Sequence, residues 1–422
     1  MNMRIIPGAL SGRIGDIISS KSQAHRLLIC ALRADAPTRI RCNSTSRDVQ
    51  ATQRCISALG AQVTQGAGTL EVKPASGACA PGALLDCGES GSTLRFMLPV
   101  AGALGCDCAF TGQGLLAQRP LSPLYEQLAE HGMTLSPQGA FPLTARGRLR
   151  PGRFEIAGNV SSQFITGLLL ALPGLPEESE IHVIGRLESE PYVNITLDAL
   201  SAFGVRVERT DAGYRVPGGQ RFRSPGEVTV EGDWSSAAFW LTAGALGGAG
   251  VECAPLRAGS AQGDRAIADM LAAMGADVTR GADSVSVRPG ALHGVDVDMR
   301  DTPDLVPIAA VAAGFARGDT RIAGVERLRL KESDRVVSVL ALLKALGVEA
   351  HEQGGVMTIR GRGGFTGGTV DAFGDHRIAM AAAIAGSVAD GPVTILGAQA
   401  SDKSYPGFFE KFAALGGRAE EE

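Results

Sequence analysis

The hydrophobic and polar positions of this chain repeat one pattern about every 70 residues. An apolar stretch with helical periodicity ends at a glycine, and two short alternating runs around a polar turn follow, as in GAQVTQGAGTLEVKP (60–74), GVRVERTDAGYRVPG (204–218) and GADVTRGADSVSVRPG (275–290). A glycine after a helix adopts the left-handed conformation without a Cβ penalty, and alternating runs around a turn form a hairpin. The pattern therefore predicts a unit of helix, glycine cap and β-hairpin.

Six glycines mark the ends of these helices: Gly60, Gly132, Gly204, Gly275, Gly347 and Gly416. The sixth copy, FAALGGRAEEE (412–422), reaches the end of the sequence before any hairpin. Two short alternating runs surround Ala9, Leu10 and Ser11 instead, so we expect this N-terminal hairpin to complete the sixth unit.

The length of 422 residues exceeds what one hydrophobic core serves, and six units divide most simply into two domains of three. If the N-terminal hairpin joins the sixth unit, one lobe is discontinuous and comprises residues 1–18 and 232–422. The other lobe, residues 19–231, is an insertion. Two chain crossings then join the lobes and make a hinge natural.

The composition, 45% hydrophobic and 20% charged, is that of a folded protein in water. The apolar stretch 378–389 is too short to cross a bilayer, and no apolar segment of a secretory signal begins the chain. The eight cysteines form no CxxC pair, so we expect reduced, buried thiols in a cytoplasmic protein.

Cations crowd the predicted helix starts, although the helix dipole disfavours them there and favours anions. Backbone N–H groups and cations pointing together form an anion site. The net charge of −4 argues against a nucleic-acid partner, so small phosphorylated or carboxylated metabolites are the better ligands. The absence of GxxxxGK[ST], and of GxGxxG after a strand, gives no support to a nucleotide cofactor. The cations in question are Lys21, Arg26, Arg95, Arg119, Lys331, Arg335, Arg377 and Lys403.

Seven motifs in a fixed order carry a family resemblance. They are KSQAHR (21–26), GESGSTLR (88–95), SSQFIT (161–166), SEPYVNIT (189–196), DTPDLVP (301–307), LKESDR (330–335) and GDHRIAM (374–380). Together they resemble the 5-enolpyruvylshikimate-3-phosphate synthases (3-phosphoshikimate 1-carboxyvinyltransferases), a family of enolpyruvyl transferases. The resemblance implies an α/β fold, a two-lobed inside-out α/β barrel of six βαβαββ repeats, three per lobe, that closes over its substrates. It also implies a cytoplasmic monomer.

The family transfers the enolpyruvyl group of phosphoenolpyruvate to the 5-hydroxyl of shikimate 3-phosphate and releases phosphate, without a metal or an organic cofactor. This is a step of the shikimate pathway towards chorismate and aromatic amino acids, and the family is the target of the herbicide glyphosate. By resemblance, the shikimate 3-phosphate set is Lys21, Ser22, Arg26, Ser161, Ser162, Gln163, Ser189, Tyr192, Asp304 and Lys331. The phosphoenolpyruvate set is Lys21, Gly91, Arg119, Gln163, Arg335, Arg377 and Lys403.

The reaction needs a base for the 5-hydroxyl, an acid for the methylene of phosphoenolpyruvate, and cations as phosphate leaves. Carried over from the family, Asp304 is the proton acceptor, while Glu332 and Lys21 are the candidates for proton transfer. In isolation, Glu332 reads as a first-turn acid and Asp304 as a cap. His376 orients its neighbours, and six histidines without paired spacing predict no metal site.

Three positions depart from the family pattern. Glu89 places a carboxylate beside the phosphate cradle, where many members have asparagine. Arg327 stands where some members have an asparagine that touches shikimate 3-phosphate. Phe96 follows Arg95 where proline is often found, so the response to glyphosate stays open.

Three other functions are compatible with parts of the pattern. A UDP-N-acetylglucosamine enolpyruvyl transferase has the same fold but carries a reactive cysteine where this chain has Gly114. An RNA 3′-phosphate cyclase shares the βαβαββ unit but needs a nucleophilic histidine and a nucleotide. A non-catalytic anion-binding scaffold would keep the arginines without needing Asp304 and Glu332.

Overall fold

The computed structural model describes residues 1–75 and 79–422, which divide into two compact units. The continuous unit is Lys21–Val230, and the discontinuous unit is Met1–Ser20 with Glu231–Glu422. The domain limits predicted from the sequence, 18/19 and 231/232, stay a prediction.

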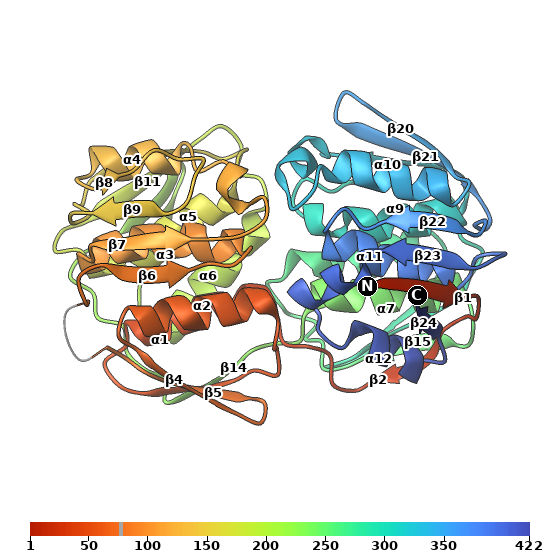
Figure 1. Cartoon of the computed structure of the whole chain (residues 1–422), viewed down its shortest axis with the longest axis horizontal. Coiled ribbons are helices and arrows are strands. Elements are labelled where there is room, and N and C mark those ends of the chain that lie inside the picture. The colour runs from red at the N-terminus through yellow and green to blue at the C-terminus, as the bar shows by residue number, and fades with distance from the viewer. Residues whose placement is uncertain (76–78) are drawn as a thin grey trace. The chain divides into compact units, whose positions relative to one another are not determined.

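The second repeat shows the common plan of the continuous unit (Figure 1). Its four-stranded sheet has the order β6-β7-β9-β8, in which β6 and β7 are parallel and β9 is antiparallel to β7 and β8. Along the chain the elements are β6 (Ala83–Asp86), α3 (Gly91–Leu104), β7 (Cys108–Thr111), α4 (Leu124–Glu130), β8 (Thr134–Leu135) and β9 (Leu143–Arg146). This is a βαβαββ repeat, as the family resemblance implies.

The third repeat has the same plan, and the first differs only in the origin of its first strand. That strand, β14 (Glu227–Thr229), comes from the far end of the unit and pairs in parallel with β3. The first repeat otherwise contains α1 (Lys21–Leu32), β3 (Thr38–Arg41), α2 (Arg47–Ala58), β4 (Gln62–Gly66) and β5 (Thr69–Lys73). The third contains β10 (Arg153–Ala157), α5 (Ser162–Ala171), β11 (Ser179–Ile184), α6 (Glu190–Ala202), β12 (Glu208–Thr210) and β13 (Gly213–Val216).

The discontinuous unit holds three further repeats, each with one four-stranded sheet. The fourth repeat contains α7 (Trp234–Leu246), β15 (Gly250–Cys253), α8 (Ala266–Ala273), β16 (Asp277–Arg280) and β17 (Val285–Arg288). The fifth contains β18 (Asp296–Asp298), α9 (Val306–Phe315), β19 (Arg317–Ala323), α10 (Arg335–Ala345), β20 (Glu349–Gln353) and β21 (Val356–Arg362). The sixth contains β22 (Gly368–Asp371), α11 (His376–Gly386), β23 (Val393–Leu396), α12 (Phe408–Ala414) and β24 (Arg418–Glu421).

The prediction that an N-terminal hairpin completes the sixth repeat is wrong for half of that segment. β1 (Asn2–Ile6) lies between β23 and β24, antiparallel to both, and does complete the sixth sheet. β2 (Ser11–Ile14) pairs in parallel with β15 and is the first strand of the fourth repeat. The two strands do not pair with each other because β1 already has a partner on each edge.

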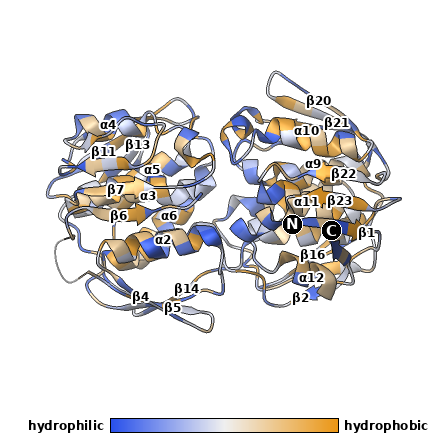
Figure 2. Ribbon diagram, viewed as in Figure 1, coloured by the Kyte–Doolittle hydropathy of each residue, from blue (hydrophilic) through white to orange (hydrophobic). Residues whose placement is uncertain are grey.

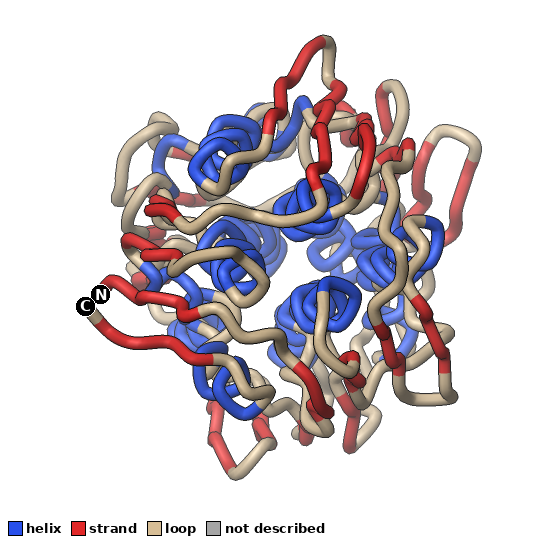
Figure 3. Tube along the Cα trace, turned by 90° about the vertical axis from the view of Figure 1, so that its right-hand side faces the viewer, coloured by secondary structure: helices blue, strands red, loops and turns tan. Residues whose placement is uncertain are grey.

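The mixed α/β class and the six repeats, three per unit, are confirmed. The described strands form six separate open sheets rather than one closed barrel. In the unit that faces the viewer in Figure 3, several helices lie in the middle with strands around them, and other helices lie further out. α11 is buried along its whole length and α9 along nearly all of it, and such apolar helices form much of the core (Figure 2).

The six glycines have the left-handed backbone that the repeat pattern predicts. Their φ angles lie between +70° at Gly204 and +104° at Gly275. A residue with a Cβ is strained in this region, so glycine ends each helix at little cost. No helix in the described part of the chain is both long and apolar enough to span a membrane.

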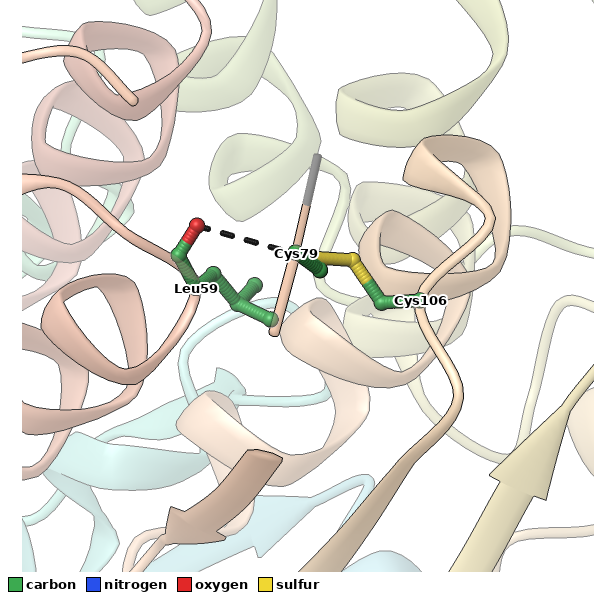
Figure 4. The surroundings of a disulfide bond; sticks show 3 residues. All are labelled: Leu59, Cys79 and Cys106. Atoms are coloured by element: carbon green, nitrogen blue, oxygen red, sulfur yellow. Dashed lines mark hydrogen bonds between the residues drawn. A yellow bond between two sulfur atoms is a disulfide. The ribbon is translucent and has the colours of Figure 1, made fainter. Parts of the chain in front are cut away.

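One cysteine prediction is wrong, because Cys79 and Cys106 form a disulfide (Figure 4). The bond joins the segment before β6 to the residue that follows the left-handed cap of α3 at Gly105. The other six cysteines are free and buried, as expected. A spacing of 27 residues without a CxxC pair gave no local signal for this bond.

The disulfide should stabilise the chain, because it closes a loop in the unfolded state. We expect replacing both cysteines by alanine to lower the free energy of unfolding by ~3–4 kcal/mol. Chemical unfolding of the wild type with and without a reducing agent measures the same effect, and the double variant serves as the control that no longer responds. A thiol titration that finds eight reactive cysteines in the denatured, unreduced chain would contradict the bond.

Candidate active site

The predicted cations are mostly withdrawn from solvent rather than spread over outer surfaces. Arg26, Arg95, Arg335, Arg377 and Lys403 are each at most 7% exposed. The side chains of Lys21 and Lys331 are 16% and 22% exposed, and Arg119 is half-buried. Lysine and arginine are rarely buried unless they are paired, so their partners decide what each unit can bind.

In the continuous unit, Lys21 is the first residue of α1 and forms a salt bridge with Asp48. The distance from Lys21 Nζ to Asp48 Oδ2 is 2.8 Å, and the carboxylate is almost fully buried. Asp48 lies in the first turn of α2, where an acid is favoured by the helix dipole. The ammonium group is thus fixed at the end of α1 by a neighbouring helix.

Arg26, one turn further along α1, is held by neutral oxygens. Its Nε donates to Thr196 Oγ1 (2.7 Å), and its Nη2 donates to the carbonyl of Tyr192 (2.9 Å). Its Nη1 donates to the carbonyl of Ser22 (2.6 Å). No carboxylate in the described residues forms a salt bridge with this buried guanidinium, so its positive charge is left for a ligand or for nearby dipoles.

Gln163 is clamped by two residues of α3. Arg95 Nη1 donates to its Oε1 (2.7 Å), and its Nε2 donates to Ser92 Oγ (2.8 Å). Arg95 also donates from Nη2 to the carbonyl of Pro120 (2.8 Å), directly after Arg119. Gln163, which like Lys21 belongs to both predicted ligand sets, is therefore fixed by two side chains of the second repeat.

Gly91 begins α3 directly under the guanidinium of Arg119. A Cβ placed on Gly91 would lie 2.7 Å from Arg119 Nη1. Ser90 caps the helix by accepting the N–H of Thr93 (3.2 Å). The start of α3 at Gly91, called the cradle below, thus has backbone N–H groups without a side chain next to them and a guanidinium packed against it. This combination is typical of phosphate sites.

The predicted serines lie at the starts of α5 and α6. Ser161 caps α5 by accepting the N–H of Gln163 (3.3 Å), and Ser162 follows as the first helical residue. Ser189 precedes α6 in the left-handed region (φ +58°) and is buried. A serine held in this strained conformation is typical of functional sites, where the surrounding structure imposes it. Tyr192 lies in the first turn of α6, half-buried.

A buried chain of hydrogen bonds joins the starts of three helices in the same unit. His25 Nδ1 lies 2.7 Å from Thr52 Oγ1, and Thr52 Oγ1 lies 2.8 Å from Thr93 Oγ1. Thr93 Oγ1 donates to Ser90 Oγ (2.8 Å). Burial lowers the pKa of His25 to about 3, so the imidazole is neutral in this chain. The cradle at Gly91 is thereby tied to α1 and α2.

In the discontinuous unit, the carboxylate of Asp304 is surrounded by three cations. Its Oδ1 is 3.2 Å from Lys331 Nζ and 2.8 Å from Arg335 Nη1. Its Oδ2 is 3.1 Å from Arg377 Nη2, and its carbonyl accepts a second bond from Arg377 Nη1 (3.0 Å). The predicted base and three predicted ligand cations therefore form one cluster.

Two more carboxylates complete this cluster around Arg335. Glu332 Oε2 is 2.8 Å from Arg335 Nη2, and Asp375 Oδ2 is 2.7 Å from Arg335 Nε. Arg335 begins α10, and Asp375 caps α11 by accepting the N–H of Arg377 (2.9 Å). His376 is buried beside this cap.

The last predicted cation of this unit is Lys403. It is buried at the end of the 3₁₀ helix Ala398–Lys403, which packs against α11. Lys403 and Arg119 each stand five residues before their α-helix, because α12 and α4 start later than the sequence pattern predicts.

The charges of the cluster shift the pKa values of its members. Burial by itself raises the pKa of Asp304, but the cations around it, Arg377 first and then Lys331, outweigh burial and hold the pKa well below its ordinary value. Burial lowers the pKa of Lys331 to about 8, although Asp304 opposes the shift. A carboxylate with such a low pKa is a weak base in the resting chain.

Sequence reasoning missed the carboxylates that hold the cations. Asp48 reads as an ordinary first-turn acid and Asp375 as a helix cap, and both are also that. Asp264 was missed as well, and burial, together with the charge of Asp304, raises its pKa to about 6. Only the GDHRIAM motif (374–380) gave any signal, because its aspartate directly precedes a predicted ligand.

Glu89 and Arg327, two of the three residues that depart from the family pattern, lie close to the predicted ligand residues. The carboxylate of Glu89 lies over Gly114, in the loop that leads to Arg119. Arg327 is half-buried in the 3₁₀ helix Glu326–Leu330, and its charge contributes to the low pKa of Lys331. Phe96 is buried in the core of the continuous unit, behind the helix start.

Comparison with known proteins gives a uniform result. Residues 5–412 match the model of the family described as EPSP synthase (3-phosphoshikimate 1-carboxyvinyltransferase). A 3-phosphoshikimate 1-carboxyvinyltransferase of Clostridium kluyveri is 40% identical over 421 residues, covering 99% of this chain and 98% of that protein. The enzyme of the same name from Aeropyrum pernix is 42% identical over 416 residues, covering 98% and 95%.

Solved structures agree with these sequence matches. EPSP synthase from Acinetobacter baumannii superposes with a TM-score of 0.82 at 25% identity, over the full length of both chains. The enolpyruvyl transferase NikO from Streptomyces tendae superposes with a TM-score of 0.80 and covers 99% of this chain and 98% of its own. At 18% identity the second match is informative about the fold alone.

The pKa of Lys331 makes the electrostatics of the cluster measurable without a substrate. We expect the charge of Lys331 to be lost as the pH rises through about 8, since burial disfavours the ammonium form. Carbon-13 NMR of the reductively methylated protein should show one lysine side-chain resonance that titrates there, beside the separate signal of the methylated N-terminal amine. Lys331→Arg should remove that resonance and leave the others in place. A Lys331 resonance that titrates at the ordinary lysine value would contradict the burial of its charge.

Proposed function

This chain belongs to the EPSP synthase (3-phosphoshikimate 1-carboxyvinyltransferase) family, whose reaction is enolpyruvyl transfer in the shikimate pathway, and we propose that its two clusters of buried cations carry out that transfer. The substrates are phosphoenolpyruvate and shikimate 3-phosphate, both polyanions. The observation that supports the proposal most strongly is the ring of three cations and two further carboxylates around Asp304 and Arg335.

Shikimate 3-phosphate is proposed to bind through the hydroxyls and amides at the helix starts of the continuous unit. Ser161, Ser162 and Gln163 offer one hydroxyl-rich helix start, and Ser189 offers a second. Arg26 would take the carboxylate of the substrate, which suits a buried guanidinium without a carboxylate partner. Tyr192 would lie against the ring, and Ser22, Lys21, Asp304 and Lys331 complete this set.

Phosphoenolpyruvate is proposed to bind at the forked cations. Arg119 stacked on the bare backbone of Gly91 suits a phosphate group, and Arg335 and Arg377 suit a carboxylate, because guanidinium forks match both anions. Lys21, Gln163 and Lys403 are the remaining members of this set. The carboxylates that now occupy Arg335 and Arg377 are thus held where the anionic groups of the ligand would bind.

Replacement of the Asp304 carboxylate by an anionic group of the ligand at Arg335 and Arg377 would make Asp304 a stronger base. When an anion takes over Arg335 and Arg377, Asp304 loses part of the positive charge that lowers its pKa. Its pKa then rises towards the range in which it can accept the proton of the 5-hydroxyl. Phosphoenolpyruvate would in this way both fill the site and prepare the base.

The remaining chemistry falls to groups next to these cations. Glu332, 2.8 Å from Arg335, and Lys21, 2.8 Å from Asp48, are the candidates that move the proton to and from the methylene carbon. Arg119, Arg377 and Lys403 would stabilise negative charge as phosphate leaves. Which of Glu332 and Lys21 delivers the proton stays a prediction.

The alternative, enolpyruvyl transfer to UDP-N-acetylglucosamine, is not favoured. The family match covers residues 5–412, and the relatives reported above carry the shikimate-pathway name. Gly114, which stands where that other enzyme has its cysteine, adopts a positive φ of +59° that disfavours a side chain. The monomeric state and the cytoplasmic location implied by the resemblance stay predictions.

The proposal is tested by removing single cations. We expect Lys21→Ala and Arg119→Ala each to lower kcat/KM for phosphoenolpyruvate about 100-fold or more, since a hydrogen bond to a charged group is worth ~1.5–3 kcal/mol and each cation can donate more than one to the ligand. The assay follows phosphate release with shikimate 3-phosphate as acceptor, and again with UDP-N-acetylglucosamine. Arg206→Ala is the matched control, because the Arg206 side chain, two residues before β12, is 76% exposed. Wild-type turnover in either cation variant would refute the site.

A second test adds one methyl group at the cradle. Gly91→Ala would place a Cβ 2.7 Å from Arg119 Nη1, so the guanidinium must move. We expect KM for phosphoenolpyruvate to rise about tenfold, the loss of ~1.4 kcal/mol of binding, while KM for shikimate 3-phosphate changes little. Gly364→Ala, where a Cβ meets nothing within 4 Å, is the control. An unchanged KM for phosphoenolpyruvate would place its anion elsewhere.

A further inference from the structure

Asp375 is the most deeply buried carboxylate of the cluster and has no place in the predicted ligand or catalytic sets. Its exposure is 0%, whereas Asp304 retains 21% at its side chain. Its Oδ2 accepts from Arg335 Nε (2.7 Å) and from Ser333 Oγ (3.1 Å). Its Oδ1 accepts from Arg335 Nη2 (3.3 Å) and from the backbone N–H of Arg377 (2.9 Å).

The contacts of Arg335 divide between two edges of its planar guanidinium. Asp375 takes the edge formed by Nε and Nη2 with both of its oxygens. The end of the fork, Nη1 and Nη2, is held by Asp304 and Glu332, each at 2.8 Å. Both of these carboxylates belong to the proposed catalytic set, so they are the partners that must exchange, and Asp375 is the partner that can stay.

We propose that Asp375 is a positioning residue for the reaction, an inference that rests on the proposed role of Arg335 as a ligand of phosphoenolpyruvate. Asp375 holds the side edge of Arg335, so the end of the fork keeps its direction when Asp304 and Glu332 release it. By capping α11, the same carboxylate also fixes the backbone of Arg377. One buried group therefore sets the spacing of two arginines that would bind the same anion.

Preorganisation of this kind should appear in substrate affinity. A free arginine would have to be ordered by the ligand itself, which weakens binding, whereas an arginine already oriented binds without that cost. A residue that serves folding alone would lower the amount of active enzyme and leave KM unchanged. The ratio of the two KM values separates these roles, because Arg335 belongs to the phosphoenolpyruvate set and not to the shikimate 3-phosphate set.

The test compares Asp375→Asn with Asp334→Asn in the full-length enzyme. Asp334 is also an aspartate that caps a helix, since it accepts the N–H groups of Val336 and Val337 at the start of α10. It is 38% exposed, and its cationic partner, Arg329, lies outside the proposed site. Asparagine caps a helix about as well as aspartate, so both substitutions keep their cap, and the backbone of Arg335 at the start of α10 stays fixed in the control. Each substitution removes one negative charge, but only Asp375→Asn removes it from the guanidinium of Arg335.

We expect Asp375→Asn to raise KM for phosphoenolpyruvate tenfold or more, because a bidentate charged pair is replaced by a neutral amide. KM for shikimate 3-phosphate should stay within about threefold of the wild type, and Asp334→Asn should change neither constant beyond that. If Asp375→Asn does not fold, Ser333→Ala, which removes one donor to Asp375 Oδ2, should show a smaller shift in the same direction. In an Arg335→Lys background, Asp375→Asn should add little, since it acts through the lost fork.

The possible failures are distinguishable. An active wild type combined with an unchanged KM for phosphoenolpyruvate in Asp375→Asn overturns the positioning role alone. An equal rise of both KM values in Asp375→Asn also overturns it. So does a rise in KM for phosphoenolpyruvate that adds in full to the effect of Arg335→Lys. A wild-type chain that releases no phosphate from phosphoenolpyruvate with shikimate 3-phosphate overturns the proposed function, and with it this inference.

Discussion

The candidate active site depends on the balance between buried arginines and the carboxylates that surround them at helix starts. Arg335 is 1% exposed and contacts three carboxylates, an arrangement that would be costly if any one side were left unpaired. Such a cluster is stable only while its charges match. Bound phosphoenolpyruvate would change that match, and the change would reach Asp304 directly because Asp304 contacts Arg335 and Arg377, the two arginines proposed to bind this ligand.

Arginines at helix C-termini show by contrast why cations at helix N-termini are unusual. Arg148 packs on Gly105, the left-handed cap of α3, and Arg223 packs on Gly204 after α6. Arg362 donates from Nη1 to the carbonyl of Gly347 after α10 (3.2 Å). These exposed cations lie at helix C-termini, where the dipole favours them, and need no ligand. The cations at helix N-termini lack this explanation and are mostly buried. Carboxylates offset the cost for Lys21, Lys331, Arg335 and Arg377 in the resting chain, and we propose that substrate supplies further negative charge.

The repeat could be predicted from the sequence because its signals are local. Each left-handed glycine, helix and hairpin depends on residues close in the chain, and the six units followed from them. The exchange of β2 into the fourth sheet was missed because it depends on β1 being paired on both edges, which no local pattern encodes. The Cys79–Cys106 bond was missed for the same reason. Ligand residues were named through motifs, whereas Asp48 and Asp375, which hold them, look like ordinary first-turn and capping acids until their tertiary partners are known.

The most direct measurement is a crystal structure of the enzyme with shikimate 3-phosphate and glyphosate, the mimic of phosphoenolpyruvate. We predict that Nη1 and Nη2 of Arg335 and Nη2 of Arg377 donate to the anionic ligand. Asp304 will then have left both arginines, while Asp375 still accepts from Arg335 Nε. A complex in which Asp304 keeps both arginines while the ligand binds elsewhere would contradict this prediction.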